Sequence, residues 1–129
     1  MKYLYAACVA ACVCAGTLAS AQSNLGKDVQ ESPSAKFTPQ DFDQFWATID
    51  AVSNDKIIGA VKKWENAENG NGGSIKLLRS FTSTDGRDCR RLKVENHAKT
   101  LKGVSNMTVC ANPQGKWLID ADARPKPKD

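Results

Sequence analysis

The spacing of hydrophobic residues changes once along this 129-residue chain, near residue 60. Before that point the large apolar side chains recur at helical spacing, and the polar side chains between them fall on the opposite face. The apolar face comprises Phe42, Phe45, Trp46 and Ile49, and the polar face Asp43, Gln44, Thr48 and Asp50. After residue 60 apolar and polar residues alternate, which indicates strands.

The predicted helix has clear signals at both ends. Thr38 can act as the N-cap, Pro39 suits the first helical position, and Asp41 occupies the acidic position of a capping box. Residues 53–55, Ser-Asn-Asp, end or restart the helix.

A second short helical turn is expected over residues 56–61. It would direct Ile57, Ile58 and Val61 inward. Gly59 disfavours this turn because glycine has a low helix propensity.

Five segments show the alternation of strands, and turn residues separate them. The strands are expected at 60–66, 73–83, 87–95, 103–111 and 116–121, with turns at 68–72, 84–86 and 112–115. In the second strand the alternation places Ile75, Leu77 and Phe81 on one face and Leu78 on the other.

This order of elements predicts an α+β fold, with an N-terminal helix packed on a small antiparallel β-meander of about five strands and one disulfide. The domain is expected to span residues 37–121. Residues 122–129 are expected to be a disordered tail, because the alternating prolines of residues 124–128 should keep that segment out of a sheet.

Residues 1–21 have the features of a secretory signal peptide. Lys2 supplies a basic start, residues 3–18 are uncharged and mostly apolar, and Ala19-Ser20-Ala21 offers a small-x-small cleavage site. A membrane anchor is the competing interpretation, but the segment is short for a span of about 20 apolar residues.

A lipoprotein signal is the second alternative for the leader. Val9-Ala10-Ala11-Cys12 matches the box that precedes a lipid-modified cysteine, so lipidation at Cys12 competes with cleavage after Ala21. Residues 22–36 are polar and are expected to form a flexible tether.

The cysteines divide at the predicted cleavage site. Cys8, Cys12 and Cys14 would leave with the leader, and the mature chain would keep Cys89 and Cys110. An even number of cysteines in an exported domain indicates a disulfide, whereas two free buried thiols are the alternative.

A Cys89–Cys110 bridge would also set the register of the third and fourth strands. If these cysteines lie directly opposite each other, the apolar residues share one face and the cysteines the other. The facing pairs would be Leu92 with Met107, Val94 with Ser105, and Arg90 with Val109, while Arg91 and Lys93 share the face of Cys89.

The net charge of the mature chain indicates which kinds of partner to expect. Removing the leader takes away Lys2 alone among the charged residues, so the formal net charge falls from +4 to +3. A nucleic-acid-binding domain would show a stronger basic stripe, and no nucleic-acid partner is expected. No transmembrane span is expected in the mature chain, and the oligomeric state stays open.

We find no catalytic constellation in the sequence. His97, placed in the loop 96–102, lacks the orienting carboxylate and nucleophile that acyl transfer needs. Two cysteines and one histidine are too widely spaced for a typical zinc site. Residues 70–73 lack the Lys-Ser/Thr sequel of a phosphate-binding loop. We therefore expect no catalytic residue, no metal and no cofactor.

A basic cluster on the third strand is the best candidate for a contact surface. It comprises Arg87, Arg90, Arg91 and Lys93. A solvated sheet face accounts for such a cluster, and so does a contact with an anionic glycan, a lipid headgroup or an acidic protein.

An ordered set of residues runs through the predicted strands. It comprises Trp64-Glu65-Asn66, Asn69-Gly70, Gly73-Ser74-Ile75, Cys89-Arg90, Cys110 and Gly115-Lys116-Trp117. In this order and spacing, residues 64–119 resemble the C-terminal domain of the rickettsial 17 kDa surface antigen family of bacterial envelope proteins. The chain departs from the family at Ala111, where an arginine often follows the second cysteine, and it has no glycine-zipper segment before the domain.

The resemblance implies a Gram-negative envelope protein in the periplasm or cell envelope, or at the outer membrane if Cys12 is lipidated. Its partner would then be an envelope component. Apart from the resemblance, Trp64 and Trp117 lie beside tight turns, where large rings can close a small core. Asn66 and Asn69 can bond the turn backbone.

Three hypotheses of function follow. The first is a non-enzymatic exported envelope protein of the surface-antigen type, with a structural or interaction role. The alternative is a small secreted binding module or enzyme inhibitor that presents the basic hairpin of residues 82–91. The third is a hydrolase that uses His97.

Overall fold

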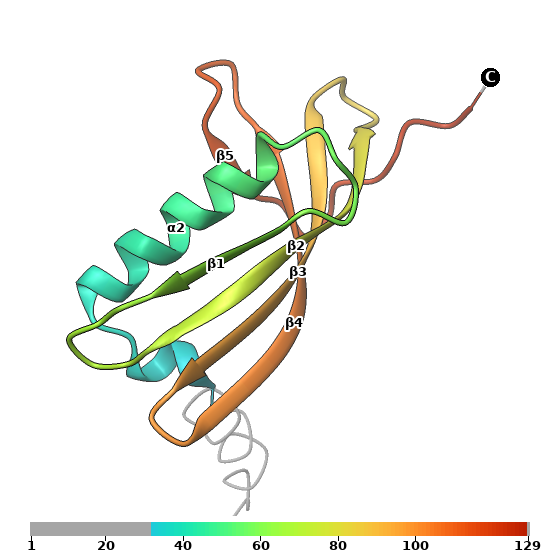
Figure 1. Ribbon diagram of the computed structural model, residues 1–129. Coiled ribbons are helices and arrows are strands. Elements are labelled where there is room, and N and C mark those ends of the chain that lie inside the picture. The colour runs from blue at the N-terminus through green and yellow to red at the C-terminus, as the bar shows by residue number, and fades with distance from the viewer. Residues whose placement is uncertain (1–31, 129) are drawn as a thin grey trace, which may run out of the picture.

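One helix lies over one face of a five-stranded antiparallel sheet (Figure 1). The computed structural model describes residues 32–128. The elements are η1 (Pro33–Lys36), α2 (Pro39–Ser53), β1 (Val61–Glu65), β2 (Gly72–Thr82), β3 (Asp88–Ala98), β4 (Leu101–Ala111) and β5 (Trp117–Ile119). The strands lie in sequence order, so the predicted meander, the α+β class and the Cys89–Cys110 disulfide are confirmed.

The predicted capping box starts α2. Thr38 Oγ1 accepts a hydrogen bond from the backbone N–H of Asp41 at 3.2 Å, and the backbone N–H of Thr38 donates to the Asp41 carboxylate at 2.8 Å. Pro39 is the first helical residue, where its missing N–H costs nothing. The helix ends at Ser53, as the sequence indicates.

The buried face of α2 differs in part from the predicted one. Phe45, Ile49 and Val52 are buried against the sheet, whereas Phe42 is 39% exposed. Thr48 was expected to face away from the core but is buried. Its hydroxyl donates to the backbone carbonyl of Gln44 at 2.7 Å, which satisfies this polar group inside the molecule.

The core lies between α2 and the sheet, with tryptophans toward its ends. Trp64 of β1 packs edge-on against Phe37, with 5.1 Å between the ring centroids. Trp117 of β5 is buried near the other end of the helix. The centre is filled by Ile75, Leu77, Leu92, Val94 and Val109.

The predicted register of β3 and β4 is confirmed. Cys89 faces Cys110, Arg90 faces Val109, Leu92 faces Met107 and Val94 faces Ser105. The apolar members of these pairs point toward the helix, and the cysteines lie on the opposite, outer face.

The alternation expected for β2 is wrong beyond Leu77. A β-bulge between Leu77 and Arg79 shifts the register with β3, so that Leu77 still faces Leu92 but Phe81 faces Cys89. Phe81 therefore lies on the outer face, because one extra residue in a strand reverses the direction of the side chains that follow it.

The predicted helical turn over residues 56–61 does not form. The chain makes a turn there with Gly59 at φ +93, and the Gly59 N–H donates to the Leu77 carbonyl at 2.8 Å. Ile57, Ile58 and Val61 were expected to point inward but are all about half exposed or more. The backbone bonds with β2 here instead of forming a helical turn, for which Gly59 has a low propensity.

The loop expected at residues 96–102 is much shorter. Strands β3 and β4 continue to Ala98 and from Leu101, and Lys99 adopts φ +59 in the two-residue turn between them. His97 is consequently a strand residue that faces Lys102. The turn lacks the glycine or asparagine that usually marks such a hairpin.

Both ends of the described chain join the domain. Pro33 is buried and contacts Gly103, so residues 33–36 belong to the fold and not to a tether. Residues 124–128 belong to none of the five strands, although Pro125 forms an isolated bridge with Ser83, next to the end of β2. The backbone hydrogen bonds of this bridge are made by the residues on either side of Pro125. The Lys126 N–H donates to the Thr82 carbonyl, so the missing N–H of Pro125 leaves no bond unmade.

The leader and tether, residues 1–31, and the lipidation candidate Cys12 lie outside the described residues. Within residues 32–128, no helix has both the length and the apolar character that crossing a membrane requires.

Candidate interaction surface

The outer face of the sheet carries a series of facing cations. Lys76 of β2 lies directly opposite Lys93 of β3, and Arg79 lies directly opposite Arg91. We call these four residues the basic ladder. Like charges directly opposite each other destabilise a sheet, so the ladder is not explained by the stability of the fold.

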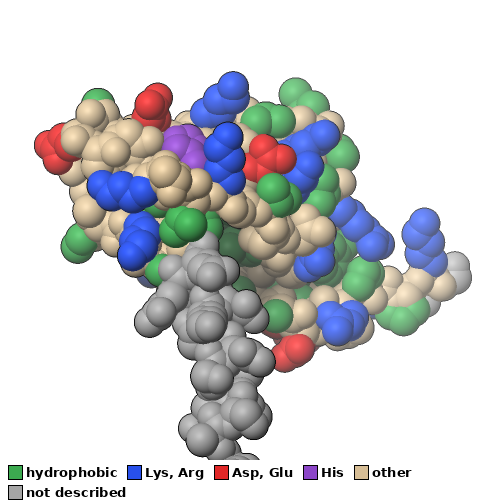
Figure 2. Space-filling model, turned by 90° about the horizontal axis from the view of Figure 1, so that it is seen from below, with side chains coloured by type: hydrophobic (Ala, Val, Ile, Leu, Met, Phe, Trp, Pro, Cys, Tyr) green, Lys and Arg blue, Asp and Glu red, His purple; other side chains and the backbone are tan. Residues whose placement is uncertain are grey.

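Few carboxylates balance the ladder. Among the described residues, Lys93–Glu95, at 3.3 Å, is the ion pair that involves a ladder residue. Three shallow hollows of about 460, 260 and 300 Å³ lie along this face. Figure 2 shows lysine and arginine side chains spread over the face seen from below, with acidic side chains at a few places between them.

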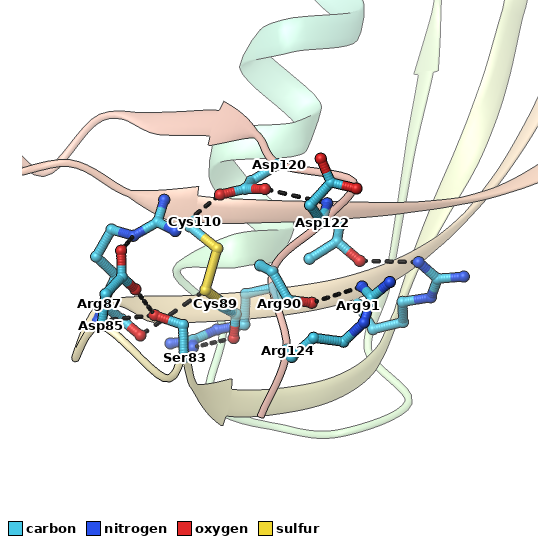
Figure 3. The surroundings of a disulfide bond; sticks show 12 residues. Ser83, Asp85, Arg87, Cys89, Arg90, Arg91, Cys110, Asp120, Asp122 and Arg124 are labelled. Carbon is cyan, nitrogen blue, oxygen red and sulfur yellow. Dashed lines mark hydrogen bonds and ion pairs between the residues drawn. A yellow bond between two sulfur atoms is a disulfide. The ribbon is translucent and has the colours of Figure 1, made fainter. Parts of the chain in front are cut away.

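The four residues of the predicted basic cluster do not form one surface. Arg91 and Lys93 belong to the ladder, whereas Arg87 and Arg90 are engaged elsewhere. Arg87 pairs with Asp120 at 2.7 Å and with Asp85 at 2.8 Å (Figure 3). These bonds raise the pKa of Arg87 above its ordinary value and lower the pKa of Asp120. The hydrogen bond from the Ser83 hydroxyl, followed by the bond from Arg87, lowers the pKa of Asp85.

Arg90 lies on the helix side of the sheet. Its Nε donates to the carbonyl of Ser53, the last residue of α2, at 3.0 Å. Its guanidinium lies 4.9 Å from the centroid of the Trp117 ring, and the indole N–H of Trp117 donates to Asn54 Oδ1 at 3.0 Å. A cation at the C-terminal end of a helix is stabilising, so Arg90 joins the helix, β3 and β5.

The disulfide Cys89–Cys110 fastens β3 to β4 beside the ladder (Figure 3). Both cysteines are buried although they lie on the outer face. The segment after β5 is bonded first to β4 and then to the residues after β2. The Asp120 N–H donates to the Thr108 carbonyl, and the Thr84 N–H donates to the Arg124 carbonyl. This segment therefore crosses β3 at the disulfide end of the sheet.

A buried carboxylate fixes the opposite end of the sheet. Asp41 is fully buried and accepts hydrogen bonds from the side-chain amides of Asn66, Asn69 and Asn71 at 2.7–3.2 Å. Burial alone would raise the pKa of Asp41. The bonds from the Thr38 N–H and the three amides outweigh it and hold the pKa well below its ordinary value.

His97 takes part in this end of the fold. Its Nε2 lies 3.1 Å from the carbonyl of Gly70 in the β1–β2 turn. Among residues 32–128, no group of three or more His, Cys, Asp or Glu side chains is placed to hold a metal ion.

Comparison with known proteins identifies the family. The family model of the 17 kDa outer membrane surface antigen matches residues 54–118. This chain belongs to that family. Neither the curated proteins nor the solved structures contain a match.

The residues that carry the resemblance to the surface antigen family lie in the core, around Asp41 and in the turns. Trp64 and Trp117 are core residues, and Asn66 and Asn69 bind Asp41. Gly70 and Gly115 adopt positive φ in turns. A Cβ on Gly73 would collide with the backbone carbonyl of Glu95, so the close approach of β2 and β3 requires glycine there.

The sequence analysis did not identify Asn71, Lys76, Arg79 or Arg124 as site residues. Asn71 lies two residues after Asn69 in the same turn. Several asparagines in one turn, together with the aspartate of the capping box, are the sequence signal that could have indicated this cluster. Arg79 had no such signal, because simple alternation places it on the wrong face. The buried role of Asp41 also lies outside the region that matches the surface antigen family.

Proposed function

We propose that this protein is an exported, non-enzymatic component of the bacterial cell envelope that holds an anionic envelope component against the outer face of its sheet. The observation that carries the proposal is the basic ladder, with two pairs of like charges on the face that α2 leaves uncovered. A partner that neutralises the ladder would relieve its repulsion, which favours binding.

Membership of the surface antigen family supports a place in the envelope. The signal-peptide pattern of residues 1–21 supports export, and the box before Cys12 supports a tethered form. A protein held close to the envelope would bind its partner at a high effective concentration, so modest affinity at the ladder would suffice.

The contacts of His97 and of the hairpin at residues 82–91 favour binding at the ladder over the two other hypotheses, a hydrolase that uses His97 and a binding module that presents the hairpin. His97 contacts a main-chain carbonyl of the neighbouring turn, which gives it a structural partner. The hairpin of residues 82–91 has its charged tip engaged within the molecule, because Asp85 bonds Ser83 and Arg87 reaches Asp120. These contacts leave the ladder as the better surface for a partner.

The test is retention of the full-length protein on envelopes isolated from its own host. Lys76→Glu with Lys93→Glu reverses two ladder charges and should weaken retention at least about tenfold, since each cation near an anionic surface contributes about 1 kcal/mol. Retention of the native protein should fall as salt rises.

Lys56→Glu with Lys116→Glu is the matched control. Both lysines are exposed and lie outside the ladder, so this variant has the same net charge but an intact ladder. It should be retained nearly as well as the native protein. Equal losses in the two variants, or no loss in the ladder variant, would contradict the proposal.

A further inference from the structure

Three arginines meet at the disulfide end of the basic ladder. Arg79, Arg91 and Arg124 line one hollow of about 300 Å³, together with Phe81, Thr108 and Pro125. The arginines come from β2, β3 and the C-terminal segment. Figure 3 shows Arg91 and Arg124 in the surroundings of the disulfide.

Two irregular features of the chain bring these arginines together. The β-bulge at Leu78 turns Arg79 to the outer face, opposite Arg91. Pairing of the C-terminal segment with the end of β2 places Arg124, since its carbonyl accepts from the Thr84 N–H at 3.1 Å. Bulges often redirect a side chain beside a functional site.

Each guanidinium is held by neutral groups. Arg79 lies over the Phe81 ring, 5.6 Å from its centroid, and Arg91 Nη1 donates to Thr108 Oγ1 at 2.8 Å. Arg124 Nη1 donates to the carbonyls of residues 121 and 123. Within residues 32–128, no carboxylate lies within ion-pair distance of any of the three. The hollow therefore has three oriented positive charges with spare N–H donors.

We propose that this hollow, the arginine site, binds a phosphate monoester. The planar guanidinium fork matches phosphate oxygens, and a phosphate monoester carries nearly two negative charges at neutral pH. A single carboxylate would neutralise one of the three cations. Phe81 and Pro125 provide an apolar wall for the carbon skeleton that bears the ester. The inference rests on the proposed function and names the anionic group that the ladder faces.

The affinity test uses the full-length protein with its disulfide intact, at pH 7.5 and fixed ionic strength. Glucose 1-phosphate, inorganic phosphate and glucuronate are titrated by calorimetry and by NMR of the arginine Nε–H groups. Both phosphates should bind, glucose 1-phosphate at least about tenfold more tightly than glucuronate. Equal affinity for glucuronate would overturn the proposal, because it would show that a single carboxylate binds there as well as a phosphate monoester does.

Arginine-to-lysine variants separate the guanidinium forks from their charge. Arg79→Lys with Arg91→Lys keeps the net charge and should weaken glucose 1-phosphate binding at least about tenfold. Lys56→Arg with Lys116→Arg, at two exposed lysines outside the ladder, is the control and should leave it nearly unchanged. Arg124→Lys repeats the test at a residue outside the strands, so a folding defect in the strand variant cannot decide the outcome. Native affinity in both arginine variants would overturn the proposal.

The phosphate could belong to a soluble sugar phosphate or to a lipid headgroup. Phosphatidylcholine vesicles with and without phosphatidic acid distinguish these sources, with glucose 1-phosphate as competitor. Binding to the phosphatidic acid vesicles that glucose 1-phosphate displaces assigns the lipid source. Binding to glucose 1-phosphate without vesicle binding assigns the soluble source. Binding to neither overturns the proposal.

The arginine site and the proposed function can fail separately. If envelope retention depends on the ladder charges but the Arg→Lys variants bind glucose 1-phosphate like the native protein, the arginine site alone is wrong. If glucose 1-phosphate binds at the arginines but the Lys→Glu variants stay on envelopes, the proposed function is wrong.

Discussion

Asp41 accepts a 2.7 Å hydrogen bond from the side-chain amide of Asn66, although 25 positions separate the two residues in sequence. The bond joins the first turn of α2 to the end of β1. Asn69 and Asn71 complete the same cluster from the β1–β2 turn. One carboxylate thus caps the helix and fixes the turn that starts the sheet.

Asp41→Asn should lower the free energy of unfolding by about 3 kcal/mol. The substitution replaces a charged acceptor with an amide whose NH₂ faces other donors, and hydrogen bonds to charged groups contribute about 1.5–3 kcal/mol. Asp43→Asn makes the same change at an exposed position of α2 and should cost less than about 0.5 kcal/mol. Urea unfolding followed by tryptophan fluorescence measures both, and equal values would contradict the role of Asp41.

The same carboxylate should make stability depend on pH in acid. Because the folded state depresses the pKa of Asp41 below the ordinary value of 3.8, its contribution is fully present above about pH 5 and is lost as pH falls below about 4. The difference in unfolding free energy between native protein and Asp41→Asn should therefore shrink between pH 5 and pH 2. A constant difference over that range would show that Asp41 does not titrate in this way.

Arg90 and Arg91 should respond differently to the same substitution. Arg90→Lys loses the bond to the Ser53 carbonyl and the contact with Trp117, which should cost about 1–3 kcal/mol of stability. Arg91 lies on the exposed outer face, where water can replace its bond to Thr108 Oγ1, so Arg91→Lys should change stability by less than about 1 kcal/mol. Thermal unfolding of the two variants checks this, and the opposite order would contradict the assignment of faces.

Removing the disulfide should destabilise the protein markedly. Cys89 and Cys110 are 21 positions apart, and closing a loop of that size contributes roughly 3 kcal/mol through the entropy of the unfolded chain. Cys89→Ala with Cys110→Ala should show this loss in urea unfolding. Dithiothreitol should then lower the stability of the native protein and leave the double variant unchanged. A similar effect of dithiothreitol on both would point to a cause other than the bridge.

Local sequence signals were sufficient for much of the architecture. Thr38, Pro39 and Asp41 define the start of α2 because capping depends on residues a few positions apart. The cysteine pair and the alternation around Leu92 predict the register of β3 and β4, because a strand repeats every two residues. The ordered tryptophans, glycines and cysteines also indicated the surface antigen family.

Tertiary structure decided the features that depend on contacts distant in sequence. The bulge at Leu78 arises from pairing with β3, so the faces of Arg79 and Phe81 could not follow from alternation. The split between Arg90 and Arg91 follows from strand geometry, but only the helix end and Trp117 show what Arg90 binds. The arginine site needs two strands and the C-terminal segment at one place, and no local pattern encodes that meeting.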